Sequence, residues 1–168
     1  GHEIAAEVVE VGTGVDRPRV GDRVFVSHHV PCGSCHYCVS GHETVCDTLR
    51  TTNFDPGGFA EFVRVPAINM KSGVFVLPEE LSDDEAVFIE PLACVVRGQR
   101  LSGLTAGTTV LVIGSGIAGQ LHIRFAKAFG AAKVIATDIV DYRKELARRS
   151  GADAVIDGRE DVPAKVRD

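Results

Sequence analysis

The fold of the second half of the chain can be read from one stretch, Val110-Leu111-Val112-Ile113-Gly114-Ser115-Gly116-Ile117-Ala118-Gly119. Its four successive apolar residues predict a strand that is buried on both faces, as in a parallel sheet. Its glycines follow the pattern G-x-G-x-x-G, and apolar residues then recur at helical spacing as far as Phe129. A glycine turn between a buried strand and a helix is typical of dinucleotide-binding sites. A glycine-rich turn that binds nothing is the alternative.

Each glycine of this turn is expected to have its own role. Gly114 permits the tight turn, Gly116 lets a pyrophosphate approach the backbone, and Gly119 lets the helix lie close to the strand. The start of the helix offers free N–H groups and the positive end of its dipole to the phosphates. The predicted cofactor-binding residues of the turn are Gly114, Ser115, Gly116, Ile117, Ala118 and Gly119.

The rest of this half repeats the alternation of strand and helix. Residues 134–136 predict a second strand, residues 141–150 a helix with Asp141 as its N-cap, and residues 154–156 a third strand. A last helix is expected to begin at Val162. The order strand–helix–strand–helix–strand is the first half of a doubly wound, Rossmann-type domain.

Asp138 ends the second predicted strand and lies 19 positions after Gly119 (138 − 119). An offset of about 20 is expected for the acid that binds the adenosine ribose. A carboxylate there accepts hydrogen bonds from both ribose hydroxyls of NAD and repels the 2′-phosphate of NADP, so we expect NAD in preference to NADP. A turn aspartate is the alternative. Arg143 could reach a cofactor phosphate or remain a solvated helix residue.

The first half contains four cysteines with the spacing C-x2-C-x2-C-x7-C. As thiolates they could surround one zinc ion tetrahedrally and leave no position open for catalysis, so the cluster predicts a structural zinc site. An iron–sulfur cluster is one alternative, although the bacterial run C-x2-C-x2-C-x3-C-P has a shorter last gap. Disulfides are another. The four residues are Cys32, Cys35, Cys38 and Cys46.

Around these cysteines the first half has the pattern of β structure. Residues 4–11, 23–27 and 59–65 predict short strands separated by glycine and proline turns, which is typical of a sandwich or barrel. The cysteine loop is inserted between two of these strands.

The two halves are expected to be joined by helices. Ser82, followed by three acidic residues, predicts the N-cap of a helix that runs to Ile89. A break is then expected at Pro91, with a second helix over residues 92–101.

Composition excludes some classes of protein. The chain has 168 residues, of which 45% are hydrophobic and 24% charged, and it carries a net charge of −5. Nucleic-acid binding selects basic surfaces, so no nucleic-acid partner is expected. No run approaches the about 20 apolar residues of a membrane span, and no secretory signal is visible, so we expect a cytoplasmic protein.

Two short motifs carry groups suited to a catalytic metal. Gly1-His2-Glu3 stands at the start, and Glu90-Pro91-Leu92 precedes the glycine turn. His2, Glu3 and Glu90 supply nitrogen and oxygen ligands of the kind that an open zinc site accepts. A lone histidine is seldom a ligand, and Glu90 could be an exposed helix-end acid. These residues therefore indicate a metal site only when they are taken together.

Taken together, these motifs resemble the zinc-dependent medium-chain dehydrogenase/reductase family of the alcohol dehydrogenase superfamily. The resemblance covers essentially the whole chain. It implies a GroES-like β-barrel catalytic domain over residues 1–77 with a structural zinc lobe at 31–47, then linker helices and the first half of a Rossmann domain over 78–168. The motifs are Gly1-His2-Glu3, Val20-Gly21-Asp22-Arg23-Val24, the four cysteines, Gly57-Gly58-Phe59-Ala60-Glu61, Glu90-Pro91-Leu92 and the glycine turn.

The resemblance also implies roles for the site residues. His2 matches the catalytic zinc histidine, and Glu3 matches a glutamate that is a ligand in some members. Glu90 stands where alcohol dehydrogenases proper carry a cysteine, and Glu-Pro-Leu looks like the sorbitol/polyol branch, in which this glutamate binds zinc or holds its water. The family's upstream cysteine ligand is not in the chain, so a sequence truncated at both ends and an incomplete catalytic site are expected.

The implied activity is NAD-linked interconversion of a secondary alcohol and its ketone, with a polyol or sugar alcohol as substrate. The alternatives within the family are L-threonine and simple-alcohol dehydrogenases. A non-enzymatic alternative is a module that is stabilised by zinc and binds NAD but does not catalyse a reaction. The chain by itself is expected to be inactive and to hold a second zinc ion weakly, and the full-length protein is expected to be a homodimer or homotetramer.

Overall fold

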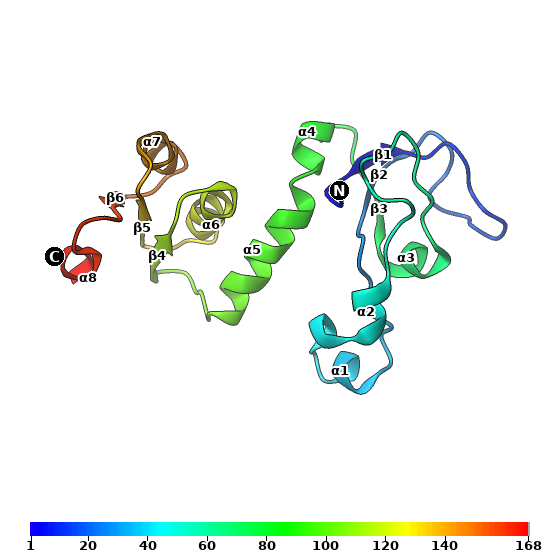
Figure 1. The fold of residues 1–168 in the computed structure, drawn as a ribbon, viewed down its shortest axis with the longest axis horizontal. Helices are drawn as coiled ribbons and strands as arrows, with labels where there is room; N and C mark the ends of the chain where they lie inside the picture. Colours follow the sequence, from blue (N-terminus) through cyan, green and yellow to red (C-terminus); the bar gives the residue numbers. More distant parts are fainter. Residues whose placement is uncertain (168) are drawn as a thin grey trace. The chain divides into compact units, whose positions relative to one another are not determined.

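A computed structural model describes residues 1–167, and the chain divides into two compact units, residues 1–90 and the residues from Pro91 onward (Figure 1). Each unit has apolar clusters of its own. Among the described residues, no helix combines the length and the apolar character needed to cross a membrane.

The first unit is built on an antiparallel sheet of three strands, in the order β1 (Ala5–Glu7), β2 (Arg23–Val26) and β3 (Val74–Val76). The central strand β2 is buried on both faces because its side chains alternate between two apolar clusters. One face packs with Phe54, and the other face packs with Leu77. This sheet is the rigid support for the residues that follow its strand ends.

The strand predicted over residues 4–11 is shorter than expected, although Val8 continues its hydrogen bonds with the backbone of residues 21 and 22. The strand predicted over residues 59–65 is wrong, since this segment forms only an isolated bridge between Asp55 and Arg64. Its Phe59 side chain is 95% exposed, so the apolar residues of this segment do not mark a buried strand face.

The cysteine loop forms a lobe of short helices, drawn in cyan in Figure 1. It contains α1 (His36–Val39), the 3₁₀ turn η1 (Glu43–Val45) and α2 (Asp47–Thr51). Beyond the lobe, the sequence did not predict α3 (Ala67–Ser72), which precedes β3. These helices are too short to be recognised from periodicity, because none completes two turns.

The connecting helices differ in two respects from the prediction, and the first is that the helix capped by Ser82 ends at Ala86 and not at Ile89. Ser82 caps α4 (Asp83–Ala86) in a capping box with Glu85, as its position predicts. The break predicted at Pro91 is wrong, because α5 (Ile89–Leu101) begins before this proline and continues through it. A proline in the first turn of a helix costs no hydrogen bond, since the N–H groups there have no partner within the helix.

The second unit has the predicted alternation of strands and helices. Its strands form a parallel sheet in the order β4-β5-β6, with Val112 of β4 paired with Ala136 of β5. The helix before the last strand is preceded by Val140 as its N-cap, so the prediction of Asp141 as the cap is wrong by one residue. The elements are β4 (Thr109–Ile113), α6 (Ile117–Ala128), β5 (Lys133–Asp138), α7 (Asp141–Arg149), β6 (Ala154–Asp157) and α8 (Val162–Arg167).

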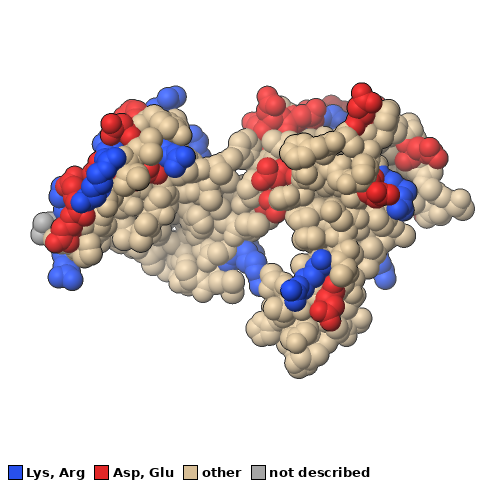
Figure 2. All heavy atoms as spheres, viewed as in Figure 1, with Lys and Arg blue, Asp and Glu red and all other residues tan. Residues whose placement is uncertain are grey.

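The two faces of this sheet are covered differently. On one face Val112, Val134 and Ala136 pack with Ile123 of α6 and Ala147 of α7 into an apolar core. The other face is crossed by α8 and carries the exposed apolar side chains described below. Acidic and basic side chains alternate over the part of the unit that carries α7 (Figure 2), where ion pairs join neighbouring turns of the helix.

Candidate functional site

The four thiols of the cysteine lobe converge on one point. Their Sγ atoms all lie within 4.8 Å of one another. The Sγ of Cys38 is 3.5 Å from that of Cys35 and 3.9 Å from that of Cys32. Thiolates bound to a tetrahedral zinc at about 2.3 Å stand roughly 3.8 Å apart, so this donor set fits the ion. The backbone reverses at Gly33 and Gly41, both at positive φ, which brings the sulfurs together.

Backbone N–H groups support negative charge on two of these sulfurs. The N–H groups of Ser34 and Cys35, with the Ser34 hydroxyl, lower the pKa of the Cys32 thiol to about 6. The N–H groups of Cys32 and Leu49 lower the pKa of Cys46. Burial raises the pKa of Cys38 to about 12. The lobe therefore favours thiolates at part of its donor set before any ion binds.

A second group of donors lies beside the sheet of the same unit. Ligand atoms of His2, His28 and Glu90 all lie within 4.8 Å of one another, and His2 Nε2 is 3.9 Å from a carboxylate oxygen of Glu90. These three residues are called the histidine–glutamate cluster below. Glu3, which the sequence also indicated, is exposed and lies outside this group. His28 was missed, since no motif contains it.

Backbone contacts hold both of the segments that carry the two histidines. The N–H of Gly58 donates to the carbonyl of Gly1 at 2.8 Å, and a Cβ at Gly58 would lie 2.5 Å from the Ile4 side chain. Only glycine therefore allows this approach, which holds the segment that carries His2. The segment that carries His28 is held by the buried Asn69 amide, which donates to the carbonyls of residues 27 and 28 at 3.0 Å each.

The environment of His28 keeps its imidazole neutral. Burial, reinforced by the neighbouring rings of His29 and His2, lowers the pKa of His28 to about 4. The His2 and His28 ring centroids are 4.4 Å apart. The Nδ1 atom of His28 is buried and has no hydrogen-bond partner among residues 1–167. A neutral imidazole with an unpaired buried nitrogen fits a metal site, because zinc binds the uncharged ring.

The glycine turn of the second unit has the geometry that its spacing predicts. Gly114 has φ +87°, in the left-handed region, and a Cβ at Gly119 would lie 2.0 Å from the Gly114 carbonyl oxygen. A Cβ at Gly116 would meet no atom within 4 Å. The close contact at Gly119 lets the helix approach the turn, and the open space beside Gly116 is where a pyrophosphate would lie.

Asp138 joins this turn to the end of β5. Its Oδ2 accepts from the N–H of Ser115 at 2.8 Å, and its Oδ1 accepts from the N–H of Val140 at 2.8 Å. Burial opposes its ionisation, but these N–H groups and the Arg143 charge outweigh burial and lower the pKa of Asp138. The carboxylate is therefore ionised and positioned, with lone pairs left to accept from ribose hydroxyls.

Arg143 is engaged elsewhere in this structure. Its Nε donates to the Tyr142 hydroxyl at 3.1 Å, and its guanidinium lies 5.7 Å from the centre of that ring. Gln120 of α6 donates its side-chain amide to the carbonyl of Ser115 at 2.8 Å. Gln120, which the sequence did not single out, therefore holds the glycine turn in place.

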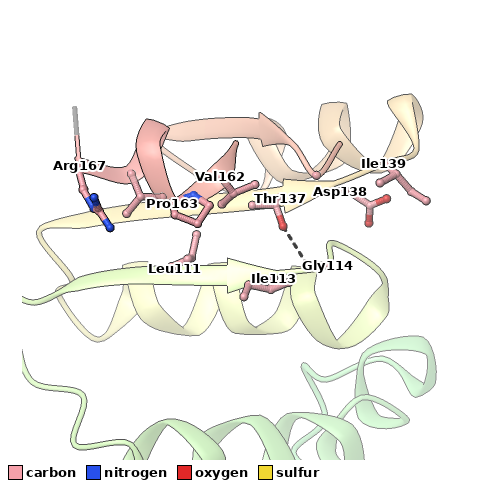
Figure 3. Close-up of a pocket in the computed structure, with 11 residues that line it drawn as sticks. Leu111, Ile113, Gly114, Thr137, Asp138, Ile139, Val162, Pro163 and Arg167 are labelled. Atoms are coloured by element: carbon pink, nitrogen blue, oxygen red, sulfur yellow. Dashed lines mark hydrogen bonds between the residues drawn. The ribbon is translucent and has the colours of Figure 1, made fainter. Parts of the chain in front are cut away.

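A cavity of about 650 Å³ opens beside Asp138 and Gly114 (Figure 3). Its walls come from the sheet face opposite α6 and from α8, and most of them are apolar. A volume in this range suits a small-molecule site. Gly114 and Asp138 in its lining are also predicted cofactor-binding residues. The apolar lining includes Leu111, Ile113, Ile139, Val162 and Val166.

Comparison with known families agrees with both units. Residues 1–78 match the family model described as alcohol dehydrogenase GroES-like domain, and residues 118–168 match the one described as zinc-binding dehydrogenase. The chain belongs to the zinc-dependent medium-chain dehydrogenase/reductase family. A GroES-like domain followed by half of a Rossmann-type parallel sheet is thus confirmed.

Relatives within this family differ in the substrates that their names give. L-threonine 3-dehydrogenase of Pyrococcus abyssi is 43% identical over 170 residues, which covers 100% of this chain and 47% of that protein. Sorbitol dehydrogenase of Bacillus subtilis is 36% identical over 162 residues, which covers 95% of this chain and 45% of that protein. The chain thus spans about half the length of the curated relatives it matches.

Among solved structures, a zinc-binding dehydrogenase from Sinorhizobium meliloti 1021 bound to NADP is 36% identical, with a TM-score of 0.87. The match covers 96% of this chain and 47% of that one. The family likeness therefore covers the fold, the zinc dependence and the use of a nicotinamide cofactor. It leaves the choice between NAD and NADP to the residues around Asp138.

Proposed function

We propose that the full-length protein carrying this chain is a zinc-dependent, NAD-linked dehydrogenase that interconverts a secondary alcohol and its ketone. The observation that carries the proposal is the histidine–glutamate cluster, in which two imidazoles and a carboxylate surround one point in a unit of the zinc-dependent family. Two nitrogen donors and one carboxylate, with a fourth position open, are a donor set of catalytic zinc sites.

His2 and Glu90 are proposed to hold the catalytic zinc. When bound, the ion would polarise the substrate hydroxyl and lower its pKa, as zinc lowers that of bound water to about 7. Glu90 is mostly buried, whereas His2 is half exposed, with side-chain exposures of 18% and 50%. Glu90 therefore fixes the inner side of the site, and His2 borders the side that a substrate can reach.

Asp138 is proposed to select NAD. Its ionised carboxylate ends β5 and is tied to the glycine turn through Ser115. The hydroxyls of the NAD ribose donate hydrogen bonds to a carboxylate, whereas the 2′-phosphate of NADP would place like charge beside it. The Arg143 charge acts on the Asp138 carboxylate and would offset part of this repulsion, so we expect a preference for NAD rather than exclusion of NADP.

A polyol or sugar alcohol is the proposed substrate, on the basis of Glu90-Pro91-Leu92. L-threonine is the second candidate, and a specific observation favours it, since the threonine dehydrogenase relative is more similar to this chain than the sorbitol dehydrogenase relative is, at 43% against 36% identity. Both substrates carry a secondary hydroxyl, so the proposed chemistry is the same. A homodimer or homotetramer belongs to the same proposal.

The proposal is tested by NADH formation in the full-length protein with polyols, L-threonine and simple alcohols. We expect turnover with a secondary alcohol, and at least about a 100-fold loss of kcat for His2→Ala, since a metal ligand is removed. Binding of NADH, followed by its fluorescence, should be unchanged in this variant. Undiminished turnover by His2→Ala would show that the cluster is not the catalytic site.

A further inference from the structure

Ser115, the second residue of the glycine turn, is held at each of its polar groups. Its N–H donates to the Asp138 carboxylate at 2.8 Å, and its hydroxyl donates to the carbonyl of Thr137 at 3.1 Å. Its own carbonyl accepts from the side-chain amide of Gln120 at 2.8 Å. Ser115 is 1% exposed, so bulk water does not replace a partner that is lost. The position of the turn therefore depends on contacts with both β5 and α6.

The amide of Gln120 also reaches a third element. Its nitrogen lies 3.4 Å from the carbonyl oxygen of Arg143, in the first turn of α7, and donates to this oxygen as well. A side-chain amide has two N–H groups, so one nitrogen serves both carbonyls. The bond to Ser115 is the shorter and therefore the stronger of the two. Gln120 thus bridges the glycine turn and the start of α7.

The oxygen of the same amide indicates that the bridge decides how the amide is oriented. The Oε1 of Gln120 is buried and has no hydrogen-bond partner among residues 1–167. Turning the amide around would place this oxygen against the carbonyls of Ser115 and Arg143, and both hydrogen bonds would be lost. An unpaired buried oxygen is unfavourable, so the two donated bonds outweigh its cost.

The start of α7 carries a charge that acts on the Asp138 carboxylate. Burial opposes the ionisation of Asp138, but the N–H of Ser115 and the charge of Arg143 are among the groups that lower its pKa. In return, the hydrogen bond from Tyr142 and the charge of Asp138 raise the pKa of Arg143. The bond to Tyr142 uses one of the five N–H groups of the guanidinium. The two charges interact because the first turn of α7 lies close to the end of β5.

We propose that Gln120 is a positioning residue that sets how well the cofactor site tolerates the 2′-phosphate of NADP. This phosphate would lie beside Asp138, in place of a ribose hydroxyl that the carboxylate binds. Arg143 offsets the like charge there only while the first turn of α7 stays beside the glycine turn, and Gln120 holds it there. The inference rests on the proposed function for the nicotinamide cofactor, and it adds a residue that lies outside the glycine motif.

Gln120→Met tests the bridge, because it keeps the length and helix propensity of the side chain but removes both donors. The measurement is the binding of NADH and of NADPH to the full-length protein, followed by nicotinamide fluorescence. NADH should bind about 5-fold more weakly, since the turn loses one hydrogen bond of ordinary strength. NADPH should bind about 25-fold more weakly, since the contribution of Arg143 is lost as well.

Arg143→Ala provides the background that separates positioning from support of the turn. This variant keeps the backbone carbonyl that Gln120 binds and removes the charge. Adding Gln120→Met to it should weaken both cofactors by the same factor of about 5, because the difference between them passes through the guanidinium. Arg149→Ala is the control, since it removes the same charge from the last turn of α7, and the unequal losses should persist in it.

Two results would overturn the inference. The first is an equal change, or no change, in the binding of the two cofactors by Gln120→Met, as expected of a residue that only supports the turn. The second is an unequal loss that persists in Arg143→Ala. An unaltered protein that binds neither cofactor would contradict the cofactor assignment and the inference together. None of these measurements involves turnover, so a protein that binds both cofactors as expected but oxidises no alcohol would contradict the proposed function alone.

Discussion

The two candidate metal sites of the first unit are encoded in opposite ways. The cysteine lobe takes all its donors from residues 32–46, so the spacing alone identifies it. The histidine–glutamate cluster takes its donors from three distant segments, one before β1, one after β2 and one in the first turn of α5, at positions 2, 28 and 90. A site of the first kind is visible in the sequence, whereas one of the second kind appears only when the fold is known.

The two regions also differ in how far their folding would depend on a bound ion. Within the lobe, α1, η1 and α2 contain no buried residue, and the apolar interior of this region is limited to Val30 and Cys46. Such a segment depends on its ion, since binding of a structural zinc is itself folding free energy. The histidine–glutamate cluster lies at the end of a sheet with apolar packing on both faces. At the cluster the packed sheet would position the metal ligands, whereas in the lobe a bound ion would stabilise the fold.

The largest effect that tests this contrast is expected for Cys46→Ser. Cys46 is 1% exposed, and a serine hydroxyl is a poor zinc ligand, so the lobe should lose its ion. Structural zinc contributes about 10–16 kcal/mol of apparent binding free energy in zinc-finger peptides, so residues 31–51 should unfold locally. Zinc content and hydrogen exchange of this segment measure both losses.

Cys94→Ser is the matched control, because it removes an exposed cysteine of α5 outside the lobe. It should keep the zinc and the protection of the lobe. Slow hydrogen exchange at residues 31–51 in metal-free Cys46→Ser would contradict the dependence of the lobe on its ion.

The glycine turn is also encoded locally, and two glycine variants should separate its two roles. Gly119→Ala places a methyl group 2.0 Å from the Gly114 carbonyl oxygen, so the unfolding free energy of the second unit should fall by about 3 kcal/mol. NADH binding should fall with it, because the turn is displaced. Urea unfolding and NADH fluorescence follow the two quantities.

Gly116→Ala is the companion variant. Its new methyl group meets no atom within 4 Å, and the φ of −69° suits alanine, so stability should be retained. NADH binding should still weaken by at least about 10-fold, because the methyl group occupies the space expected for the pyrophosphate. Equal effects of both variants on stability would refute the separate roles of the two glycines.

The same contrast explains which features could be predicted. The parallel sheet and the four-cysteine group follow from patterns of adjacent residues, and the structure confirms both. The strand expected over residues 59–65 failed because strand propensity does not say whether a partner strand lies alongside. His28 escaped notice for a similar reason, since only the folded chain brings its ring beside that of His2. Features that depend on pairing between distant segments cannot be derived from local pattern.

The smallest of these effects concerns Asn69. Its side chain anchors the segment between β2 and the cysteine lobe, which also carries His28. Asn69→Ala removes both donors to the carbonyls of residues 27 and 28 in a fully buried position. The unfolding free energy should fall by about 2 kcal/mol, because these carbonyls lose their partner. His28 would also be less well positioned, so a Co²⁺ probe at the histidine–glutamate cluster should bind about 10-fold more weakly.

Ser72→Ala, at an exposed position of the same helix, is the control and should change neither quantity. The two readouts test separate points. A fall in stability without weaker Co²⁺ binding at the histidine–glutamate cluster would mean that the rest of the fold positions His28 without this anchor. Weaker binding of that ion, with an unchanged charge-transfer band from cobalt bound at the four thiolates, would instead show that the cluster needs a buried hydrogen-bond anchor and that the cysteine lobe does not.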